Sequence, residues 1–470
     1  MSSSPARRDQ TEALRATRLD VLIIGGGING AGLLRDLALR ARVSGESLRA
    51  GLIEQAHFGS GTSGKNSHLI HGGLRYLKYL QFHLVRESLC ERAILLRVAS
   101  KFVQPLEFLL PMYGLKSRLL YGTGLWLYDR LAGSQPVARH RSLSAAGVAE
   151  IEPGLNRSGL TAGAIFYDGA VRSAPFVVEN VLDGIAHGGF AANYARAASW
   201  ERGVFGDWNV RVEDALSGAQ FELRARKLVD ARGAWTDRSI LRLVRGSHIV
   251  IPRVNAGHHA IAHFEPNGRI VFLIPWGSEH QLTLVGTTDE DHQGSPDQVR
   301  IAPVEAQYLL GVVKKLYPSE REVNPISAFS SLRPLVRADH RSATSASRDH
   351  KIWNSADGVL HIAGGKYTTY RAMAEEAGDL ICREIAPALA NVHRTAETPF
   401  PAVNRSIGDA MEQRLRDYLF VSTTLGYERR WDAESLIPHA RALGAKLGWA
   451  ADRICREISE CVKATGLESL

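Results

Sequence analysis

A glycine-rich turn followed by an acidic residue is the first feature whose residue types and spacing could do chemistry. The turn reads Gly25-x-Gly27-x-x-Gly30, and Glu54 follows about 20 residues later. The first glycine allows a tight turn, the second lets the backbone approach a pyrophosphate, and the third lets a helix pack closely on a strand. The helix N-terminus then faces phosphates with unpaired N–H groups, and a carboxylate accepts hydrogen bonds from ribose hydroxyls. These residues predict a site for an adenine dinucleotide.

The residues around the turn supply the strand, helix and loop that such a site needs. Val21–Ile24 are continuously apolar, as in a buried parallel strand, and leucines recur at helical spacing after the turn. A second apolar strand ends at Glu54, and a long run of small residues follows instead of a short return to another helix. Thr62 and Ser63 in that run offer hydroxyls beside a bound pyrophosphate. This loop favours FAD over NAD.

Several later segments, taken together, resemble one group of flavoproteins. "IGGGINGAGLLRD" is followed in order by "LIHGGLRYL", "RGSHIVIPR", "VGTTDEDHQG", "SLRPLV" and "HIAGGKYTTYRAMAEEA". In these segments the chain resembles the FAD-dependent glycerol-3-phosphate dehydrogenases, which have the D-amino-acid-oxidase fold. The resemblance implies a mixed α/β architecture. It comprises a Rossmann-like FAD-binding domain, an antiparallel-sheet substrate domain and a small C-terminal helical cap.

The resemblance also implies that the FAD domain is discontinuous in sequence. The expected ranges are 19–110, 150–245 and 355–385 for the FAD domain, 111–149 and 246–354 for the substrate domain, and 400–470 for the cap. The middle of the chain is rich in strand-like alternation, and the last part has helical spacing. The first 20 residues are expected to form a disordered tail.

The resemblance further implies oxidation of sn-glycerol 3-phosphate to dihydroxyacetone phosphate, with hydride transfer to flavin N5. Arginine suits the dianionic phosphate because its planar fork donates two parallel hydrogen bonds. Arg75 with Tyr76, and Arg333, are expected to line the substrate site, and Thr287 is expected to help position the substrate. A base that titrates near neutrality favours histidine, and His248 is the expected proton acceptor.

Lys366 completes an expected catalytic set with His248 and Arg333. By the resemblance, Lys366 lies close to the flavin and the reacting carbon, where a cation stabilises developing negative charge. An alternative stays open, in which His248 only orients the hydroxyl and Lys366 or water accepts the proton. The further residues expected to contact FAD are Asn29, His71, Gly72, Gly364, Gly365 and Thr368. No metal site is expected, because the four cysteines form no CxxC pair.

Positions 68 and 232 depart from the pattern of the family. His68 occupies a position where the family usually has lysine, and the lysine of this loop, Lys65, lies three residues earlier. Arg232 occupies a position where the family usually has threonine. Both departures concern the details of flavin contact, and flavin binding itself remains the expectation.

Composition restricts the partners of the chain. Its 470 residues are 45% hydrophobic, and a formal charge of +8 admits an anionic metabolite, an anionic membrane surface or nucleic acid. No dense basic run with interleaved aromatics occurs, so nucleic acid is not expected. Residues 108–131 mix Leu, Trp and Tyr with Lys and Arg. They are read either as a core-facing helix pair or as a basic amphipathic surface on a membrane. The expected location is cytoplasmic, with a peripheral contact on the inner face of the membrane, and a homodimer is expected.

The sequence leaves three functions open. The first is a glycerol-3-phosphate dehydrogenase that passes electrons to a quinone, with oxygen (a glycerol-3-phosphate oxidase) as the alternative acceptor. The second is a flavin oxidase or dehydrogenase of a 2-hydroxy acid or an amine, which needs one cation for a carboxylate. The third is a non-catalytic FAD-binding or scaffold protein, which would be expected to lose the substrate cations. Retention of Arg75, Arg333 and Lys366 favours the first.

Overall fold

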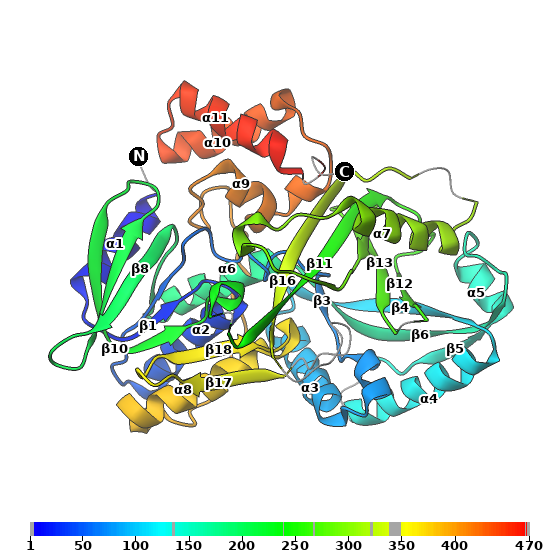
Figure 1. Ribbon diagram of the computed structural model, residues 1–470, viewed down its shortest axis with the longest axis horizontal. Helices are drawn as coiled ribbons and strands as arrows, with labels where there is room; N and C mark the ends of the chain where they lie inside the picture. Colours follow the sequence, from blue (N-terminus) through cyan, green and yellow to red (C-terminus); the bar gives the residue numbers. More distant parts are fainter. Residues whose placement is uncertain are drawn as a thin grey trace.

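Two sheets lie side by side in this protein, with helices packed around them and a helical C-terminal segment above their junction (Figure 1). The computed structural model describes residues 4–133, 137–237, 239–266, 268–319, 323–337, 349–465 and 467. The expected mixed α/β fold with two sheets and a helical cap is confirmed. Within the described residues, no helix combines the length and apolarity that crossing a membrane would require.

Among the described residues, the first sheet has eight strands, drawn from three distant parts of the chain. They are β1 (Leu19–Ile24), β2 (Ala50–Ile53), β7 (Phe190–Ala192), β8 (Ala195–Arg202), β9 (Trp208–Asp214), β10 (Gln220–Asp230), β17 (His350–Asn354) and β18 (Leu360–Gly364). β1 pairs in parallel with β10 and β2, which pair in parallel with β18 and β7. Every residue of β1 is buried. Since both faces of a parallel sheet are covered, this explains the continuous apolar run in its sequence.

The second sheet, in the part of the chain that the structure describes, has ten strands and is antiparallel except where β12 meets β4. They are β3 (Leu69–Ile70), β4 (Val103–Tyr113), β5 (Arg141–Ser144), β6 (Leu160–Val171), β11 (Leu241–Pro252), β12 (Ala260–Phe264), β13 (Ile270–Trp276), β14 (Leu282–Gly286), β15 (Glu290–Asp291) and β16 (Ser327–Val336). β4 and β6 pair with each other here, although the sequence reading places 103–110 and 160–171 in the FAD domain. The domain boundaries drawn from the sequence stay a prediction.

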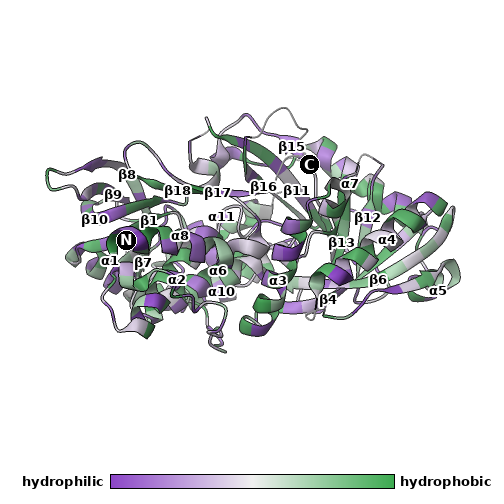
Figure 2. Ribbon diagram, turned by 90° about the horizontal axis from the view of Figure 1, so that it is seen from below, coloured by the Kyte–Doolittle hydropathy of each residue, from purple (hydrophilic) through white to green (hydrophobic). Residues whose placement is uncertain are grey.

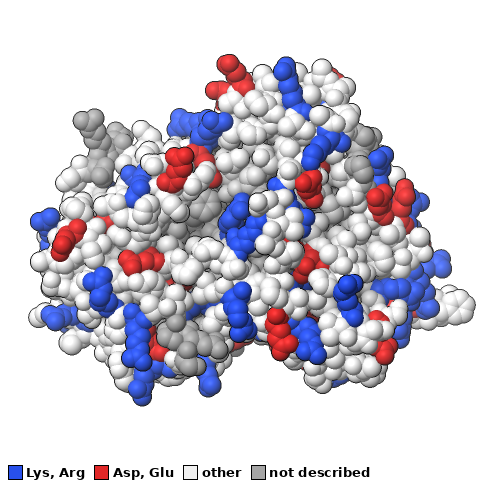
Figure 3. Space-filling view, turned by 180° about the vertical axis from the view of Figure 1, so that it is seen from behind, with Lys and Arg blue, Asp and Glu red and all other residues white. Residues whose placement is uncertain are grey.

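Helices cover both sheets and form the cap. They are α1 (Pro5–Ala16), α2 (Ile28–Ser44), α3 (Phe82–Val98), α4 (Leu115–Ala132), α5 (Ala145–Ile151), α6 (Ser173–Ala186), α7 (Pro303–Leu316), α8 (Tyr370–Ile385), α9 (Leu415–Asp417), α10 (Ala433–Leu447) and α11 (Ala451–Val462). α2 packs between α6 and α8 on the first sheet. Buried ion pairs join these helices, because Arg35 binds Asp183 of α6 and Arg40 binds Asp379 of α8. On the face shown in Figure 3, basic and acidic side chains are interspersed.

The N-terminal segment is a helix, so the expectation of a disordered tail is wrong. The Ser4 hydroxyl caps α1 by accepting a hydrogen bond from the backbone N–H of Arg7. The Arg7 side chain binds Asp214 at 2.9 Å, and Leu14 is fully buried against the first sheet. Serine followed by proline is a helix-start signal. The sequence therefore contained the cue, and the buried contacts of α1 stabilise the helix that it begins.

Candidate active site

The glycine turn lies between β1 and α2, at the carboxyl end of the parallel strands. Gly25 has a φ of +114°, a conformation that side-chain-bearing residues rarely adopt. A Cβ on Gly30 would lie 2.0 Å from the Gly25 carbonyl oxygen, so only glycine permits this approach of helix to strand. Gly27 is the N-cap of α2, and Asn29 is half-buried in its first turn. Ligands of open α/β sheets bind at this edge, and the N–H groups of α2 face it.

Glu54 and the loop that follows it are bonded directly to this turn. One carboxylate oxygen of Glu54 accepts a hydrogen bond from the Gly26 N–H at 2.7 Å, and the other accepts one from Ala56 at 2.9 Å. Burial raises the pKa of Glu54, and these two backbone donors oppose the rise. The Ser63 hydroxyl accepts a hydrogen bond from the Ile28 N–H at 2.9 Å. The loop is therefore held across the N-terminus of α2.

The turn after β18 brings a second glycine pair to the same region. Gly364 and Gly365 both have positive φ, at +74° and +77°. A Cβ on Gly364 would lie 2.6 Å from a backbone oxygen, and one on Gly365 would lie 2.5 Å from the Met373 sulfur. The Thr368 hydroxyl then accepts a hydrogen bond from the backbone N–H of His71 at 3.2 Å, which joins this turn to the segment before α3. These close backbone approaches, with the glycine cradle at β1, fit a bound dinucleotide.

His248 and Arg333 project from the same face of the second sheet. β11 pairs with β16 so that His248 lies opposite Phe329, and Val244 lies opposite Arg333. Alternate residues of a strand share a face, so His248 and Arg333 are on one side. Arg333 extends over Gly246, where a Cβ would lie 2.4 Å from its guanidinium. The two side chains therefore approach each other along the sheet.

Arg333 is anchored by the segment that follows β14. Its guanidinium donates hydrogen bonds to Asp289 at 2.6 Å, to the Thr288 carbonyl at 3.1 Å and to the Thr287 hydroxyl at 2.8 Å. The Asp289 carboxylate is buried and the Arg333 side chain is about one-fifth exposed, at 18%. Such a buried, charge-assisted bond fixes the orientation of the guanidinium. The structure thus joins two of the predicted site residues, Thr287 and Arg333.

Lys366 and Tyr76 lie together on a different wall, against α3. The Lys366 ammonium donates hydrogen bonds to the Leu84 carbonyl at 3.0 Å and the Ser88 hydroxyl at 2.7 Å. The same ammonium lies 4.9 Å from the centre of the Tyr76 ring, a cation–π distance. Arg75 belongs to the short helix η1 (Leu74–Tyr79), but its side chain lies outside the described part of the structure.

Gly72 is enclosed by a buried polar cluster. Its N–H donates to Asp168 at 3.1 Å, and the same carboxylate oxygen accepts from Tyr128 at 2.7 Å and from Arg92 at 2.6 Å. Burial raises the pKa of Asp168, while Arg92 and these hydrogen bonds oppose the rise. A Cβ on Gly72 would lie 2.3 Å from the Tyr128 hydroxyl. The "HGG" segment is thus held rigidly between β6, α3 and α4.

The structure shows what surrounds the two residues that depart from the family pattern, His68 and Arg232. His68 is buried, with its ring 4.6 Å from Trp276 and 6.2 Å from Phe329, and burial lowers its pKa to about 3. Both of its ring nitrogens are buried and make no hydrogen bond with any residue that the structure describes. Arg232 forms a two-pronged ion pair with Asp230, at 2.9 and 2.8 Å. A neutral ring thus stands at position 68, and the charge at position 232 is neutralised.

The structure adds residues that the sequence reading missed. Ser67 lies 2.9 Å from the His248 ring, Asp289 holds Arg333, and Gly246 and Gly286 leave space for these two side chains. Asp289 follows Thr287 closely in sequence, so the sequence already indicated that Asp289 would lie near the site. Ser67 had no such signal, because its partner lies far along the chain.

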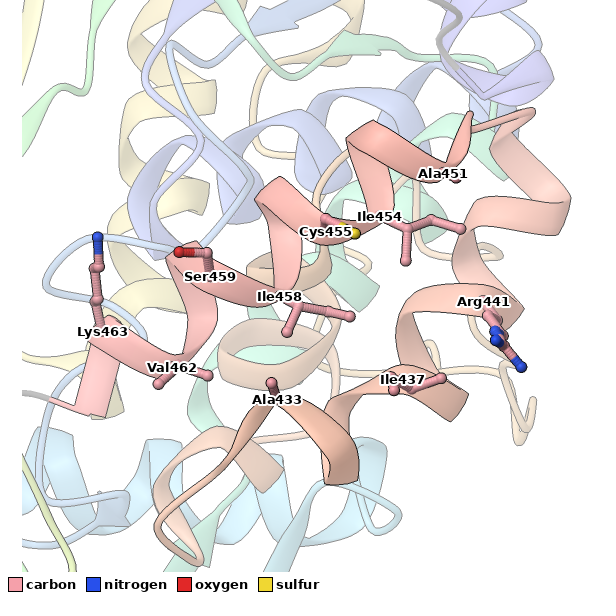
Figure 4. A pocket seen from close by; sticks show the side chains of 10 residues that line it. All are labelled: Ala433, Ile437, Arg441, Ala451, Ile454, Cys455, Ile458, Ser459, Val462 and Lys463. Carbon is pink, nitrogen blue, oxygen red and sulfur yellow. The ribbon is translucent and has the colours of Figure 1, made fainter.

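A separate groove lies in the cap between α10 and α11 (Figure 4). Its volume is about 550 Å³, and no residue of the candidate active site lines it. Ile437, Ile454 and Ile458 make it mainly apolar, and Arg441 and Lys463 stand near its two ends. The groove and the candidate active site are therefore distinct regions.

The fold and the two glycine turns, Gly25–Gly30 and Gly364–Gly365, are those of a flavin enzyme. Comparison with known proteins gives the same class. Residues 20–380 match the family model described as FAD dependent oxidoreductase, and the chain belongs to that family. FAD as the cofactor is thereby confirmed.

The curated relatives belong to a narrower group within this family. The chain is 34% identical over 433 residues to the glycerol-3-phosphate dehydrogenase of Pseudomonas aeruginosa, covering 88% of this chain and 80% of that protein. It is 33% identical over 411 residues to the mitochondrial glycerol-3-phosphate dehydrogenase of Mus musculus, covering 80% of this chain and 54% of that protein. The resemblance read from the sequence segments is confirmed.

Solved structures share the fold at lower identity. The glycerol-3-phosphate dehydrogenase of Bacillus halodurans, complexed with FAD, has a TM-score of 0.78 at 22% identity, covering 100% of this chain and 99% of that one. The FAD-bound L-alpha-glycerophosphate oxidase of Mycoplasma pneumoniae has a TM-score of 0.63 at 18% identity, covering 82% of this chain and 99% of that one. A glycine oxidase from Geobacillus kaustophilus has a TM-score of 0.60 at 17% identity, covering 82% and 99%. Since enzymes with these different names share the fold, the fold alone assigns neither substrate nor electron acceptor.

Proposed function

We propose that this enzyme oxidises sn-glycerol 3-phosphate to dihydroxyacetone phosphate and passes the electrons to a quinone. The observation that carries the proposal is the placement of Arg333 beside His248 on one face of the second sheet. A phosphate needs a fixed cationic fork, and a secondary alcohol needs a nearby proton acceptor. The names of the curated relatives support the same substrate.

Each of the four cationic or basic side chains has its own role in the proposed reaction. Arg333, oriented by Asp289, binds the phosphate together with Arg75 and places the secondary carbon toward the flavin. The bound flavin supplies the hydride acceptor. His248 takes the hydroxyl proton as the carbon–oxygen double bond forms, so the carbon loses a hydride and the oxygen loses a proton. Lys366 contributes positive charge near the reacting carbon.

The turn segments Gly25–Gly30 and Gly364–Lys366 are proposed to hold FAD between the two sheets. Glu54 would contact the ribose, and the loop with Thr62 and Ser63 would run beside the pyrophosphate. Asn29, His71, Gly72 and Thr368 are proposed as further contacts. In the structure Thr62 donates to the Leu332 carbonyl at 2.6 Å, which ties this loop to β16 and supports a common site for cofactor and substrate.

The quinone acceptor is supported by the outer face of α4. Four large apolar side chains of this helix are more than half exposed: Leu115, Leu119, Leu120 and Trp126. Lys116, Arg118 and Arg130 are also exposed on α4, and Figure 2 shows green and purple residues interspersed along it. An exposed apolar strip with basic neighbours suits the surface of an anionic membrane, where quinones reside. We therefore propose a peripheral contact with the inner face of the cytoplasmic membrane.

Anaerobic reduction of the bound flavin tests the substrate. The purified protein should show a flavin spectrum that glycerol 3-phosphate bleaches without oxygen, while a 2-hydroxy acid or glycine leaves it unchanged. The bleached enzyme, mixed with a soluble quinone analogue or with oxygen, should recover its spectrum faster with the quinone. Bleaching by a hydroxy acid but not by glycerol 3-phosphate would overturn the substrate assignment. Faster recovery with oxygen would make the enzyme an oxidase.

A further inference from the structure

The segment between β14 and β15 sends alternate side chains to different partners. The Thr287 hydroxyl and the Asp289 carboxylate accept hydrogen bonds from Arg333, at 2.8 and 2.6 Å. The Thr288 side chain between them is bonded elsewhere, because its hydroxyl donates to Glu305 at 2.6 Å. The segment therefore holds Arg333 with two of its side chains and is itself held by the third.

Glu305 lies behind the second sheet, on the face opposite to Arg333. Val244 of β11 lies opposite Arg333 of β16, so these two residues share a face. Ser247 is three residues further along β11 and points to the other face. The Ser247 hydroxyl donates to Glu305 at 2.9 Å, and α7, which carries Glu305, packs on β11 (Figure 1). Thr288 thus connects the face that carries Arg333 with the back of the sheet.

The buried carboxylate of Glu305 is itself fixed by several bonds whose directions are defined. One oxygen accepts from the hydroxyls of Thr288 and Ser247. The other accepts from the Ala302 N–H at 2.9 Å, at the start of α7, and pairs with Arg245 at 2.9 Å. Because an ionised carboxylate only accepts hydrogen bonds, the Thr288 hydroxyl is the donor, and its oxygen accepts from the Ser247 N–H at 2.9 Å. Both hydrogen bonds of the Thr288 hydroxyl are therefore assigned.

The direction of the Arg333 guanidinium depends on this segment. Besides the two side chains, the Thr288 carbonyl accepts a hydrogen bond from Arg333 at 3.1 Å, so each of residues 287–289 supplies one oxygen. These residues lie between β14 and β15, outside the strands. The Thr288 hydroxyl joins them to the sheet and α7 with bonds of 2.6 and 2.9 Å, whereas the Thr288 N–H lies 3.4 Å from the Ser247 carbonyl. The Thr288 side chain therefore ties the segment down more tightly than its backbone N–H does.

We propose that Glu305 is a positioning residue for Arg333 and that it acts through Thr288, setting the direction in which the guanidinium meets the substrate phosphate. This inference rests on the proposed role of Arg333 and adds the group that supports it from behind the sheet. The Arg333 side chain keeps an accessible surface, at 18% exposed, whereas Glu305 is buried. Glu305 therefore affects substrate binding only through the residues that it holds.

Thr288→Val and Glu305→Gln disturb this hydrogen bond from either end, and Thr283→Val is the matched control. The buried Thr283 hydroxyl on β14 likewise donates to a side-chain oxygen, of Asn255 at 3.0 Å, and accepts from a backbone N–H, of Val254 at 3.2 Å. Anaerobic bleaching at increasing glycerol 3-phosphate gives the dissociation constant and the limiting rate. Thr288→Val and Glu305→Gln should each raise the dissociation constant about 10-fold, with flavin content and limiting rate within about threefold of wild type. Thr283→Val should bind the substrate like wild type.

Combination with Arg333→Lys separates positioning from a general loosening of the fold. If Glu305 acts through Arg333, Thr288→Val should weaken binding by about twofold or less once the planar fork is gone. The same loss of affinity in both backgrounds overturns the proposal, as does wild-type affinity in Thr288→Val. If Glu305→Gln retains no flavin, Thr288→Val alone decides.

A crystal structure of the Thr288→Val holoenzyme reads the orientation of Arg333 without relying on turnover. The guanidinium should lose at least one of its three hydrogen bonds to residues 287–289 or occupy more than one conformer. An unmoved guanidinium with all three bonds overturns the proposal. If glycerol 3-phosphate does not bleach the wild type, the proposed function fails, and this structure still decides whether Thr288 and Glu305 orient Arg333.

Discussion

At the scale of single residues, Arg333 shows how a charge can be oriented without being fully buried. Asp289 is 1% exposed and Arg333 is 18% exposed, so the pair lies at the edge of the interior. Removing the arginine outright would take an ion-pair partner away from a buried carboxylate, at a cost of about 3–5 kcal/mol in stability. A substitution that keeps the charge therefore separates substrate binding from folding.

Arg333→Lys is expected to weaken substrate binding while leaving the protein folded. Lysine keeps one positive charge but loses the planar fork that donates two parallel hydrogen bonds. The Michaelis constant for glycerol 3-phosphate should rise about 10- to 100-fold. Arg242→Lys, at a more exposed ion pair with Asp291 on the neighbouring strand β11, serves as control and should leave that constant unchanged. Equal constants for wild type and Arg333→Lys would remove Arg333 from the substrate site.

His68 is predicted to make the protein less stable in mild acid. Its pKa is lowered from 6.5 in the unfolded chain to about 3 in the fold, because burial disfavours the imidazolium. Below pH 6.5 the unfolded chain binds the extra proton, so stability falls as pH falls, by about 2 kcal/mol at pH 5.

Denaturant unfolding of His68→Leu measures this effect. Between pH 7.5 and 5, the variant should lose about 2 kcal/mol less stability than wild type. His83→Leu, at an exposed histidine, should follow wild type. Parallel pH profiles for wild type and His68→Leu would contradict the prediction.

At the scale of elements, the β1–α2 turn depends on glycine for space as well as for dihedral angles. The expected effect of Gly30→Ala is loss of flavin, because the added Cβ meets the Gly25 carbonyl oxygen at 2.0 Å and must push helix from strand. Absorbance of bound flavin relative to protein measures this. Gly45→Ala at the end of the same helix is the control, since its Cβ meets nothing within 4 Å. Its φ of +68° costs about 1 kcal/mol in stability, without loss of flavin.

The exposed face of α4 is predicted to contact the membrane. Leu119→Ser combined with Trp126→Ser should reduce co-sedimentation with vesicles that contain anionic lipid, because apolar area buried in the interface supplies much of the binding. Val204 and Phe205 are almost fully exposed at the turn between β8 and β9. Val204→Ser with Phe205→Ser is therefore the matched control. If both double variants sediment like wild type, α4 is not the membrane contact.

At the scale of the whole molecule, the proposed flavin site joins segments that lie far apart in the chain. The turns at Gly25–Gly30 and Gly364–Lys366 and the loop at Ser63 come from different parts of the sequence. A ligand that binds only the folded state adds about 4 kcal/mol when present at a thousandfold excess over its dissociation constant.

Removal of FAD should therefore lower the melting temperature. For 470 residues, the unfolding entropy converts that free energy to about 4 °C. Differential scanning fluorimetry of apoprotein with increasing FAD should show a rising midpoint, and riboflavin, which lacks the pyrophosphate and adenosine, should raise it less. Coincident midpoints with and without FAD would mean that these segments do not hold the cofactor together.

The sequence by itself determined the dinucleotide turn, the mixed α/β class and membership of the flavoprotein family. These features depend on local rules: glycine at Gly25 for a positive φ, a continuous apolar run for a buried parallel strand, and short segments in a fixed order. It also contained the helix signal at Ser4 and Pro5.

Only the tertiary structure decided which side chains meet. Ser67 and His248 are 181 residues apart, and their contact depends on where the loop lies on β11. The space for the His248 ring depends on strand register, which places Gly286 on one side and Phe329 on the other. Register and loop placement are set by packing across the whole core, so no local pattern encodes them. For this reason the residue types at the site could be read from the sequence, but the orientation of the proposed proton acceptor could not.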